Sequence, residues 1–421
     1  MGYRVVLAQT EADKLAKDQR AVVRPQPDRG ETVTNRSRPE LDPLGLRAGS
    51  FLIYPRLGVH EAYDDNIFAA DEDETGAFVT LISPRLDVVS DWNNHVLQFH
   101  ADGTIGRYAA QTEENYEDFS VSATARVDIT RQAKLRTGIS YNRLHEGRGS
   151  PDDVRRQRGS PPVEPTVFDV SSASVTYEQW LGRFVLDLSG TADQLDYDDV
   201  RTEDGGTITT DDRDRAIFAG GAKVGYEFIP GYTAFVRSVV DYRRYDDLNA
   251  FNRLDRDSDG YLIGVGTALE LSGILFGELA IGYRSQDYDD PRLEAVDGVA
   301  GQASVTWTPT GLTTVSAAIT REIVETTVDQ SASIFETAGR LVLDHELLRN
   351  LLLQARVSVT DDDFQGVERS DTYVGAGFSA NYLMNRYLRL DLQYDHLRGD
   401  SDAQGEDFVD NTITFGILVQ I

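Results

Sequence analysis

The chain of 421 residues contains no cysteine. Without thiols it can form neither a disulfide framework nor a cysteine-based metal or redox site, and this suits an oxidising envelope compartment. It has no run of about 18 apolar residues, so no transmembrane helix is expected. Basic residues are also scarce: 41 Lys and Arg accompany 70 Asp and Glu, and the formal net charge is −29. This excess of negative charge excludes nucleic acid as a partner, because a phosphate backbone binds a basic surface.

Motifs of catalysis and of cofactor binding are missing as well. The chain contains no HExxH, no G-x-S-x-G and no glycine-rich phosphate loop, and its six histidines are scattered. The sequence therefore predicts a protein that is not an enzyme and holds no cofactor. A hydrolase stays open as an alternative, because His100, His145 and His396 could combine with nearby acidic residues.

What the chain does have is alternation of apolar and polar residues from Phe51 to its last residue. The stretch "NLLLQARVSVT" (350–360) is typical, and "YLRLDLQYD" (387–395) and "TITFGILVQI" (412–421) repeat the pattern. Successive side chains of a β-strand point to opposite faces, so each segment predicts a strand with one apolar and one polar face.

Turn signals divide these strands into hairpins. Tight turns are expected at "DWNN" (91–94), "TRQA" (130–133), "QWLG" (179–182), "IPGY" (229–232), "LSGI" (271–274), "TPTG" (308–311), "ELLR" (346–349) and "LMNR" (383–386). Longer polar connections are expected near 69–76, 110–114, 147–165, 199–212, 246–257, 288–292, 327–331, 364–370 and 399–406. The two kinds alternate strictly, and together they predict about 18 strands with both termini at the short-turn side.

A soluble β-sandwich, propeller or solenoid would also contain many strands. However, the expected strands are longer than the usual five or six residues or so, and long connections occur on one side only. Both features indicate an all-β transmembrane barrel, an up-and-down antiparallel sheet with periplasmic short turns and extracellular long loops, in the bacterial outer membrane. Residues 49–421 are assigned to the barrel. Residues 1–48 are expected to be a flexible periplasmic tail, with 1–9 as a possible remnant of a signal peptide.

Aromatic residues near the tight turns are expected to mark one membrane interface. They are Trp92, Trp180, Trp307, Tyr232, Tyr382 and Tyr387. The recurring Tyr-Asp-Asp of "EAYDDN" (61–66), "LDYDDV" (195–200), "RRYDDL" (243–248) and "QDYDDP" (286–291) falls at the far ends of strands. We expect these tyrosines in the opposite aromatic girdle and the carboxylates on an acidic rim.

The acidic rim also suggests a cation. Hard oxygen ligands suit Ca²⁺, which could bridge the rim to anionic lipopolysaccharide. The candidate ligands are Asp289, Asp290, Asp361, Asp362 and Asp363. The alternative is a solvated acidic surface without a bound ion.

Charged residues of both signs are expected on the lumen face. They are His100, Asp102, Arg126, Asp128, Arg136, Asp187, Arg237, Asp241, Glu278, Arg284, Arg356, Arg389 and Asp391. Such a wall can form a polar path for a hydrophilic solute, or its ion pairs can stiffen a closed structural barrel that serves surface interactions. The connection at 147–165 carries Arg148, Arg155, Arg156 and Arg158, so it is expected to fold inward against lumenal acids, with a free surface loop as the alternative.

Several stretches resemble the family of proteobacterial outer-membrane proteins called putative β-barrel porin 2. They include "GSFLIYPRLGVHEAYDDNIFA" (49–69), "YNRLHEGRGSPDD" (141–153), "RDSDGY" (256–261), "GYRSQDYDD" (282–290), "DHELLRNLLL" (344–353) and "YLMNRYLRLDLQYDHLRGDS" (382–401). The resemblance spans about residues 44–421 and implies a porin-like barrel surrounded by outer-membrane lipid and lipopolysaccharide. Some relatives occur with exopolysaccharide export machinery, which suggests polysaccharide or that machinery as a partner. The chain ends in Ile421, where many outer-membrane barrels end in an aromatic residue.

Overall fold

A computed structural model describes residues 32–153, 163–202, 204–249, 252–328 and 330–421. These residues form an all-β structure with a single sheet of nineteen strands, plus a two-stranded hairpin. The short strand β1 (Leu46–Ala48) leads into the sheet, and the other eighteen strands form its wall. None of the described residues belongs to a helix long and apolar enough to cross a membrane.

The wall strands are 12 to 16 residues long. The first nine are β2 (Phe51–Asp64), β3 (Ala77–Ser90), β4 (Val96–Tyr108), β5 (Tyr116–Asp128), β6 (Ala133–His145), β7 (Val167–Leu181), β8 (Phe184–Tyr197), β11 (Arg215–Ile229) and β12 (Tyr232–Tyr245). The other nine are β13 (Ser258–Ser272), β14 (Leu275–Tyr288), β15 (Val296–Thr310), β16 (Thr313–Val324), β17 (Ser333–Leu348), β18 (Leu351–Gln365), β19 (Ser370–Asn385), β20 (Leu388–Ser401) and β21 (Phe408–Gln420). The connections contain the 3-10 turns η1 (Thr112–Glu114) and η2 (Asp211–Arg213) and the hairpin β9 (Val200–Arg201) with β10 (Thr207–Ile208).

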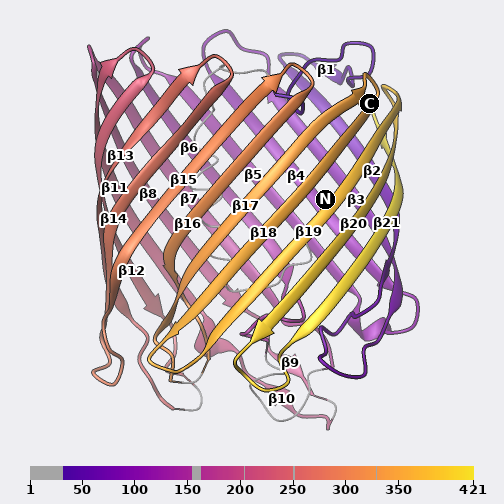
Figure 1. Cartoon of the computed structure of the whole chain (residues 1–421), viewed down its shortest axis with the longest axis vertical. Helices are drawn as coiled ribbons and strands as arrows, with labels where there is room; N and C mark the ends of the chain where they lie inside the picture. The colour runs from indigo at the N-terminus through magenta and orange to yellow at the C-terminus, as the bar shows by residue number, and fades with distance from the viewer. Residues whose placement is uncertain (1–31, 154–162, 203, 250–251, 329) are drawn as a thin grey trace.

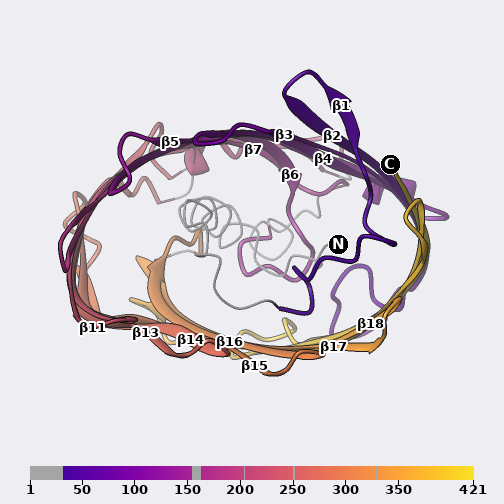
Figure 2. The same cartoon turned by 90° about the horizontal axis from the view of Figure 1, so that it is seen from above.

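The wall closes on itself. Each strand pairs antiparallel with the next one along the chain, and β2 pairs with β21 from Arg56↔Gln420 to Asp64↔Thr412. Figure 1 shows the tilted strands, and Figure 2, a view along the barrel, shows their closed oval outline around a lumen. Closure leaves no strand edge unpaired, and this is what allows a sheet to lie in lipid. The eighteen strands predicted from the turn signals are therefore confirmed.

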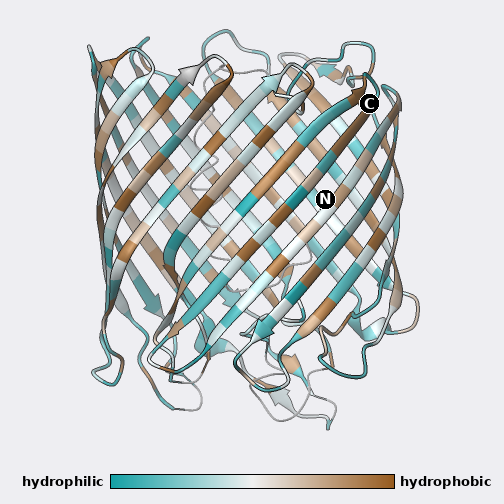
Figure 3. Cartoon of the chain, viewed as in Figure 1, coloured by the Kyte–Doolittle hydropathy of each residue, from teal (hydrophilic) through white to brown (hydrophobic). Residues whose placement is uncertain are grey.

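The outer face of the wall is apolar. Exposed side chains such as Ile263, Val265 and Ile281 are 57%, 56% and 56% accessible, whereas their sequence neighbours face the lumen. The alternation of brown and teal along the strands in Figure 3 follows this pattern. An apolar surface that encircles the barrel would be unstable in water, so this face is the one that contacts lipid.

The two ends of the barrel differ as the turn lengths predict. The tight turns form the upper end in Figure 1, and the long connections form the lower end, where β9 and β10 lie. Phe51 at the start of β2 pairs with Ser90 beside a tight turn, so the wall begins at the short-turn end. Ile421 also lies there, and its N–H donates to the carbonyl of Pro55 at 3.2 Å.

The segment before the wall folds into the lumen at the short-turn end (Figure 2). The backbone N–H of Val33 donates to the hydroxyl of Thr314 at 3.0 Å. Arg38 pairs with Glu346 at 2.7 Å, and the two side chains are 4% and 5% exposed. Burial of a matched charge pair holds this segment against β16 and β17. Residues 32–42 therefore differ from the flexible tail expected from their polar composition, and residues 1–31, including 1–9, lie outside the described part.

Gly45 then turns the chain toward β1. It adopts φ +71°, and a Cβ atom at this position would lie 2.6 Å from Cε1 of the Tyr54 ring. Glycine is the residue that combines a positive φ with so close an approach. Strand β1 follows and pairs with the start of β2, from Leu46↔Ile53 to Ala48↔Phe51.

Candidate functional site

The lumen wall carries all thirteen charged residues that the alternation assigned to it. Arg237 shares the inward parity of Phe235 and Val239 on β12. Contacts with polar neighbours on the lumen face place the others. The contacts are His100 with Asp87 and Asp102 (2.7 Å each), Arg126 with Asp128 (3.2 Å), Arg136 with Glu178 (3.2 Å), Asp187 with Lys223 (2.9 Å), Glu278 with Gln302 (3.0 Å), Arg389 with Asp391 (2.7 Å), Arg284 with Asp241, and Arg356 with Asp395. The wall is polar, and both signs of charge are largely matched within it.

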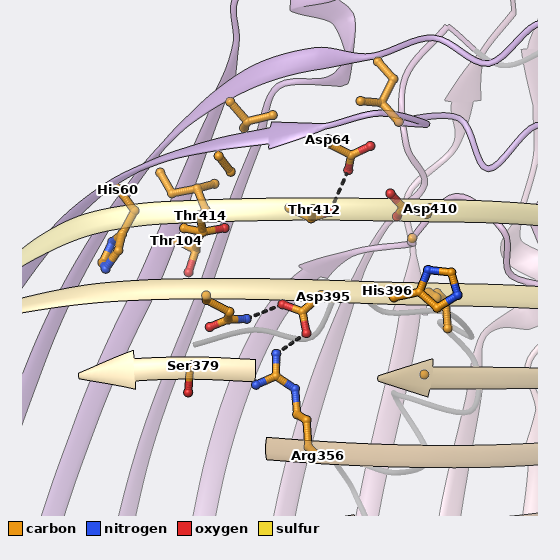
Figure 4. Close-up of a pocket in the computed structure, with 18 of the residues that line it drawn as sticks. His60, Asp64, Thr104, Arg356, Ser379, Asp395, His396, Asp410, Thr412 and Thr414 are labelled. Atoms are coloured by element: carbon orange, nitrogen blue, oxygen red, sulfur yellow. Dashed lines mark hydrogen bonds and ion pairs between the residues drawn. The ribbon is translucent and has the colours of Figure 1, made fainter. Parts of the chain in front are cut away.

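A cavity of about 500 Å³ lies in the lumen between β2–β6 and β17–β21. Its lining combines charged groups with the hydroxyls of Thr104, Thr412 and Thr414, as Figure 4 shows. Arg356 reaches across from β18 to the carboxylate of Asp395 on β20. These strands are contiguous in the wall through the pairing of β2 with β21, so the cavity lies against one side of the lumen, and polar groups point into it from both halves of this arc.

The connection after β6 forms the roof of this cavity at the long-connection end. Glu146, Gly147 and Arg148 line the cavity, and Arg148 pairs with Glu114 of η1 at 2.6 Å. A Cβ atom at Gly149 would lie 3.0 Å from Cζ of Phe408 on β21. The segment therefore reaches the long-connection end of β21 and runs inside the oval of Figure 2.

The same segment then attaches to the connection between β16 and β17. Oδ1 of Asp152 accepts hydrogen bonds from the Thr326 hydroxyl (2.9 Å), the Thr327 hydroxyl (2.8 Å) and the Thr327 N–H (2.7 Å). Because β6 and β16 lie on opposite sides of the barrel, residues 146–153, which we call the crossing segment, span the lumen. The inward folding predicted for this connection is confirmed for residues 147–153, although Arg148 contacts Glu114 of η1 and Asp153 of the same segment rather than acids of the wall strands. Arg155, Arg156 and Arg158 lie outside the described residues.

A buried polar network surrounds the base of the crossing segment. Arg213 pairs with Glu146, with each side chain 2% exposed, and the guanidinium lies 4.0 Å from the centre of the Tyr197 ring. Farther along the wall, Tyr245 donates its hydroxyl to Glu325 at 2.7 Å, and Arg243 pairs with the same carboxylate.

This network corrects one expectation about the Tyr-Asp-Asp repeats. All four copies do lie at strand ends that enter long connections, but Tyr197, Tyr245 and Tyr288 point inward, whereas Tyr63 alone among the four points outward. The reason is the alternation itself, since these three tyrosines share the parity of lumenal residues on their strands. The outer aromatic girdle at this end is formed instead by other residues, including Phe78, Tyr242, Tyr261 and Tyr283 beside Tyr63.

Five of the six aromatic residues expected at the short-turn interface lie on the outer side. Trp92, Trp307, Tyr382 and Tyr387 are 40% to 52% exposed, and Tyr232 packs against the outward Phe228 with ring centres 6.1 Å apart. Trp180 is the exception: its indole N–H donates to Glu178 at 3.3 Å, and Glu178 pairs with the lumenal Arg136. Proximity to a turn could not reveal this, because the face is set by the parity of residue 180 in β7.

The acidic residues proposed for Ca²⁺ do not converge. Strand β18 continues to Gln365, so Asp361 and Asp363 point to one face and Asp362 to the other. Asp290 is engaged by Arg292 at 2.5 Å, and this contact holds the pKa of its carboxyl well below the usual range. Among the described residues, one group of three carboxylates, Asp64, Asp65 and Asp410, has ligand atoms that all lie within 4.8 Å of one another.

The three histidines considered for a hydrolase lie in separate places. His145 contacts Asp118 at 2.9 Å and stacks on Tyr116, and His396 contacts Asn411 at 2.8 Å. His100 sits between two carboxylates. Within the part of the chain that is described, none of the three hydrogen-bonds to a serine or threonine hydroxyl, so a nucleophile-activating pair is not assembled there.

Several lumenal residues escaped the sequence reasoning, among them His60, Asp87, Lys223, Arg340 and Asp395. His60 is 2% exposed, lines the cavity and lies 3.4 Å from Asp391. The sequence did indicate them, because all five occupy the alternating strand positions whose side chains face the lumen. Applying the alternation to every strand, and not only to the most regular ones, would have found them.

The chain was also compared with known proteins. Solved structures with a similar fold include OccK3 (OpdO) of Pseudomonas aeruginosa, with 16% identity, a TM-score of 0.43 and coverage of 88% of this chain and 96% of that one. A BenF-like porin from Pseudomonas fluorescens Pf-5 has 12% identity, a TM-score of 0.43 and coverage of 88% and 98%. The structure of Pseudomonas aeruginosa OpdK with vanillate has 11% identity, a TM-score of 0.46 and coverage of 88% and 99%.

A sequence comparison with curated proteins found no match. The family model described as "Putative beta-barrel porin 2", in contrast, matches residues 38–421, which include the whole wall and the start of the lumenal N-terminal segment. The chain therefore belongs to this family of β-barrel porins.

Proposed function

We propose that the protein is a passage for small hydrophilic solutes across the bacterial outer membrane, narrowed by the crossing segment. The observation that carries the proposal is the cavity of about 500 Å³ inside the wall, lined by polar groups and roofed by residues 146–148. Short turns would face the periplasm and long connections the exterior, as in other barrels of this kind.

The chemistry of the lining suits this role. A solute that leaves water loses hydrogen bonds, and a wall of hydroxyls, amides and ion pairs replaces them. Because charges such as Arg356 and Asp395 are paired, they offer polar contacts without a strong net field at that point. The proposal assigns no catalytic step to the site.

A closed structural barrel is the second candidate, because two segments occupy the lumen. Residues 32–42 lie at the short-turn end, and the crossing segment lies at the other. Ion pairs around the wall would then serve rigidity alone. The two candidates differ in ion conduction, which a passage requires and a plug prevents.

A more specific form of this proposal is that the passage exports a polysaccharide. A polymer would need the crossing segment to leave the lumen, whereas small solutes can pass beside it. We therefore expect neutral dextran fragments to reduce conductance more strongly in a variant without the segment than in the intact protein.

The test is deletion of residues 149–163 in the full chain, followed by single-channel recording in planar bilayers. The proposal expects conductance in the intact protein and a larger conductance in the deletion variant. Deletion of residues 403–405, in the connection between β20 and β21, is the matched control and should leave conductance unchanged. A folded intact protein and a folded deletion variant that both fail to conduct would reject the passage and support the closed barrel.

A further inference from the structure

Three arginines gather on the lumen wall around the seam where the barrel closes. Arg389 lies on β20, Arg56 on β2 and Arg85 on β3. Arg56 and Arg85 are direct register partners, and both face inward, because Leu57 and Leu86 next to them are 46% and 40% exposed on the outer face. On β20, Arg389 lines the cavity.

Two of these arginines already have carboxylate partners. Nε of Arg85 lies 2.9 Å from Asp87, and Nε of Arg389 lies 2.7 Å from Asp391. Asp87 is engaged further by His100 at 2.7 Å. The acids nearest to the seam are thus committed to other groups.

Arg56 differs from its neighbours. It is half-buried, its Nε is shielded from water, and it forms no hydrogen bond or ion pair with any described residue. Like charges directly opposite each other on adjacent strands destabilise a sheet. A shielded guanidinium donor without an acceptor adds a further cost. Asp87 attracts Arg56 electrostatically but is already bonded to Arg85 and His100. Among the described residues, Arg56 is therefore a cationic position without a hydrogen-bond acceptor of its own.

An oxyanion would satisfy it. Arginine presents parallel N–H donors that match the two oxygens of a carboxylate or phosphate, and the neighbouring arginines add attraction. The position is open to solute, because the side chains of Arg85 and Arg389 are 48% and 31% exposed. It lies on the short-turn side of the cavity. Strand β2 starts at the short-turn end, and Arg56 comes before the cavity-lining His60 on this strand.

We propose that Arg56, flanked by Arg85 and Arg389, binds the oxyanion group of a solute, a carboxylate or a phosphate, at the short-turn side of the lumen. The inference rests on the proposed passage for the route by which such a solute arrives. The binding itself does not depend on transport, so the two can fail separately.

The experiment measures the thermal unfolding midpoint of the full chain in detergent micelles, by heat-modifiable gel mobility, as inorganic phosphate or acetate is titrated at constant ionic strength. At least one of the two probes should raise the midpoint of the wild type through binding to the folded state, and no response to either would overturn the proposal. In Arg56→Gln the half-saturating concentration should rise by about tenfold or more, because a hydrogen-bonded charge pair is lost. A response to phosphate alone would indicate that the site prefers a doubly charged oxyanion. A response to both probes would indicate that it also accepts carboxylates.

Arg398→Gln is the matched control, since this arginine lies near the other end of β20 on the outer face and pairs with Asp400 at 2.5 Å. It should keep the full phosphate response, which separates the site from general effects of salt. Without either probe, Arg56→Gln should unfold at the same temperature as the wild type or a higher one, because a like-charge contact is removed. Equal phosphate responses in Arg56→Gln and wild type, or a lower midpoint of Arg56→Gln in probe-free buffer, would overturn the proposal in favour of a structural role.

Discussion

Asp152→Ala should detach the crossing segment from the opposite wall. The side chain of Asp152 is 2% exposed, and its Oδ1 accepts three hydrogen bonds from Thr326 and Thr327. A hydrogen bond to a charged group contributes about 1.5 kcal/mol or more, and because the three donors share one oxygen we count two, or about 3 kcal/mol. This shifts the equilibrium between attached and detached segment by about a hundredfold. The backbone ladders of the wall are untouched, so the barrel itself should fold normally.

Single-channel recording in planar bilayers measures the result. Asp152→Ala should show larger or more frequent high-conductance events than the wild type. Asp152→Asn is the control, because its amide oxygen can still accept hydrogen bonds, and its effect should be smaller. The reasoning is refuted if a correctly folded Asp152→Ala variant has the same conductance and the same open-state noise as the wild type, since the attachment would then not limit the passage.

Leu392→Arg, on the exposed outer face, should cost about 2–4 kcal/mol and impair folding on heat-modifiable gels, whereas Gln393→Arg on the lumen face should be tolerated; equal damage from both would contradict the facing. Burial raises the pKa of Asp214, beside η2, to about 7. Because this pKa exceeds the ordinary value of 3.8, the stabilisation from its protonated form is present below about pH 4 and lost as pH rises to about 7. The protection factors of amides at the start of β11, which are the intrinsic exchange rates at each pH divided by the observed rates, should therefore fall over that interval in the wild type but not in Asp214→Asn. Parallel pH profiles of the protection factors would exclude the assignment. Arg38→Ala leaves the buried Glu346 without its main partner, at a cost of about 3 kcal/mol, so residues 32–42 should become cleavable by added protease in micelles; unchanged resistance would show that other contacts hold the segment.

The sequence by itself determined the number of wall strands and the inward face of the residues on it. A strand has a period of two, so "YLRLDLQYD" fixes Arg389 and Asp391 on one face and Leu390 and Leu392 on the other, without knowledge of any neighbour. Turn lengths are equally local, and they gave the two different ends of the barrel. Closure then follows physically, because an apolar outer face in lipid permits no open strand edge.

Two expectations are wrong because they use position along the chain and disregard the alternation of faces within a strand. The tyrosines of the Tyr-Asp-Asp repeats were placed by their position at strand ends, although Tyr197, Tyr245 and Tyr288 share the parity of lumenal residues. The carboxylates from Asp361 to Asp363 were grouped because they are adjacent in sequence, although adjacency within a strand separates them onto opposite faces. In these cases the sequence contained the answer.

Other features were decided by the tertiary structure alone. Nothing near Asp152 in the sequence indicates Thr326 and Thr327 as its partners, 174 and 175 residues away, because only the curvature of the closed wall brings these connections together. Arg38 looked like part of a solvated tail, because its neutralising partner Glu346 comes 308 residues later. Likewise, the seam that places Arg56 near Arg389 exists only once the first and last wall strands have paired. Contacts across a lumen depend on the diameter and register of the barrel, and these are properties of all eighteen strands together rather than of any local stretch.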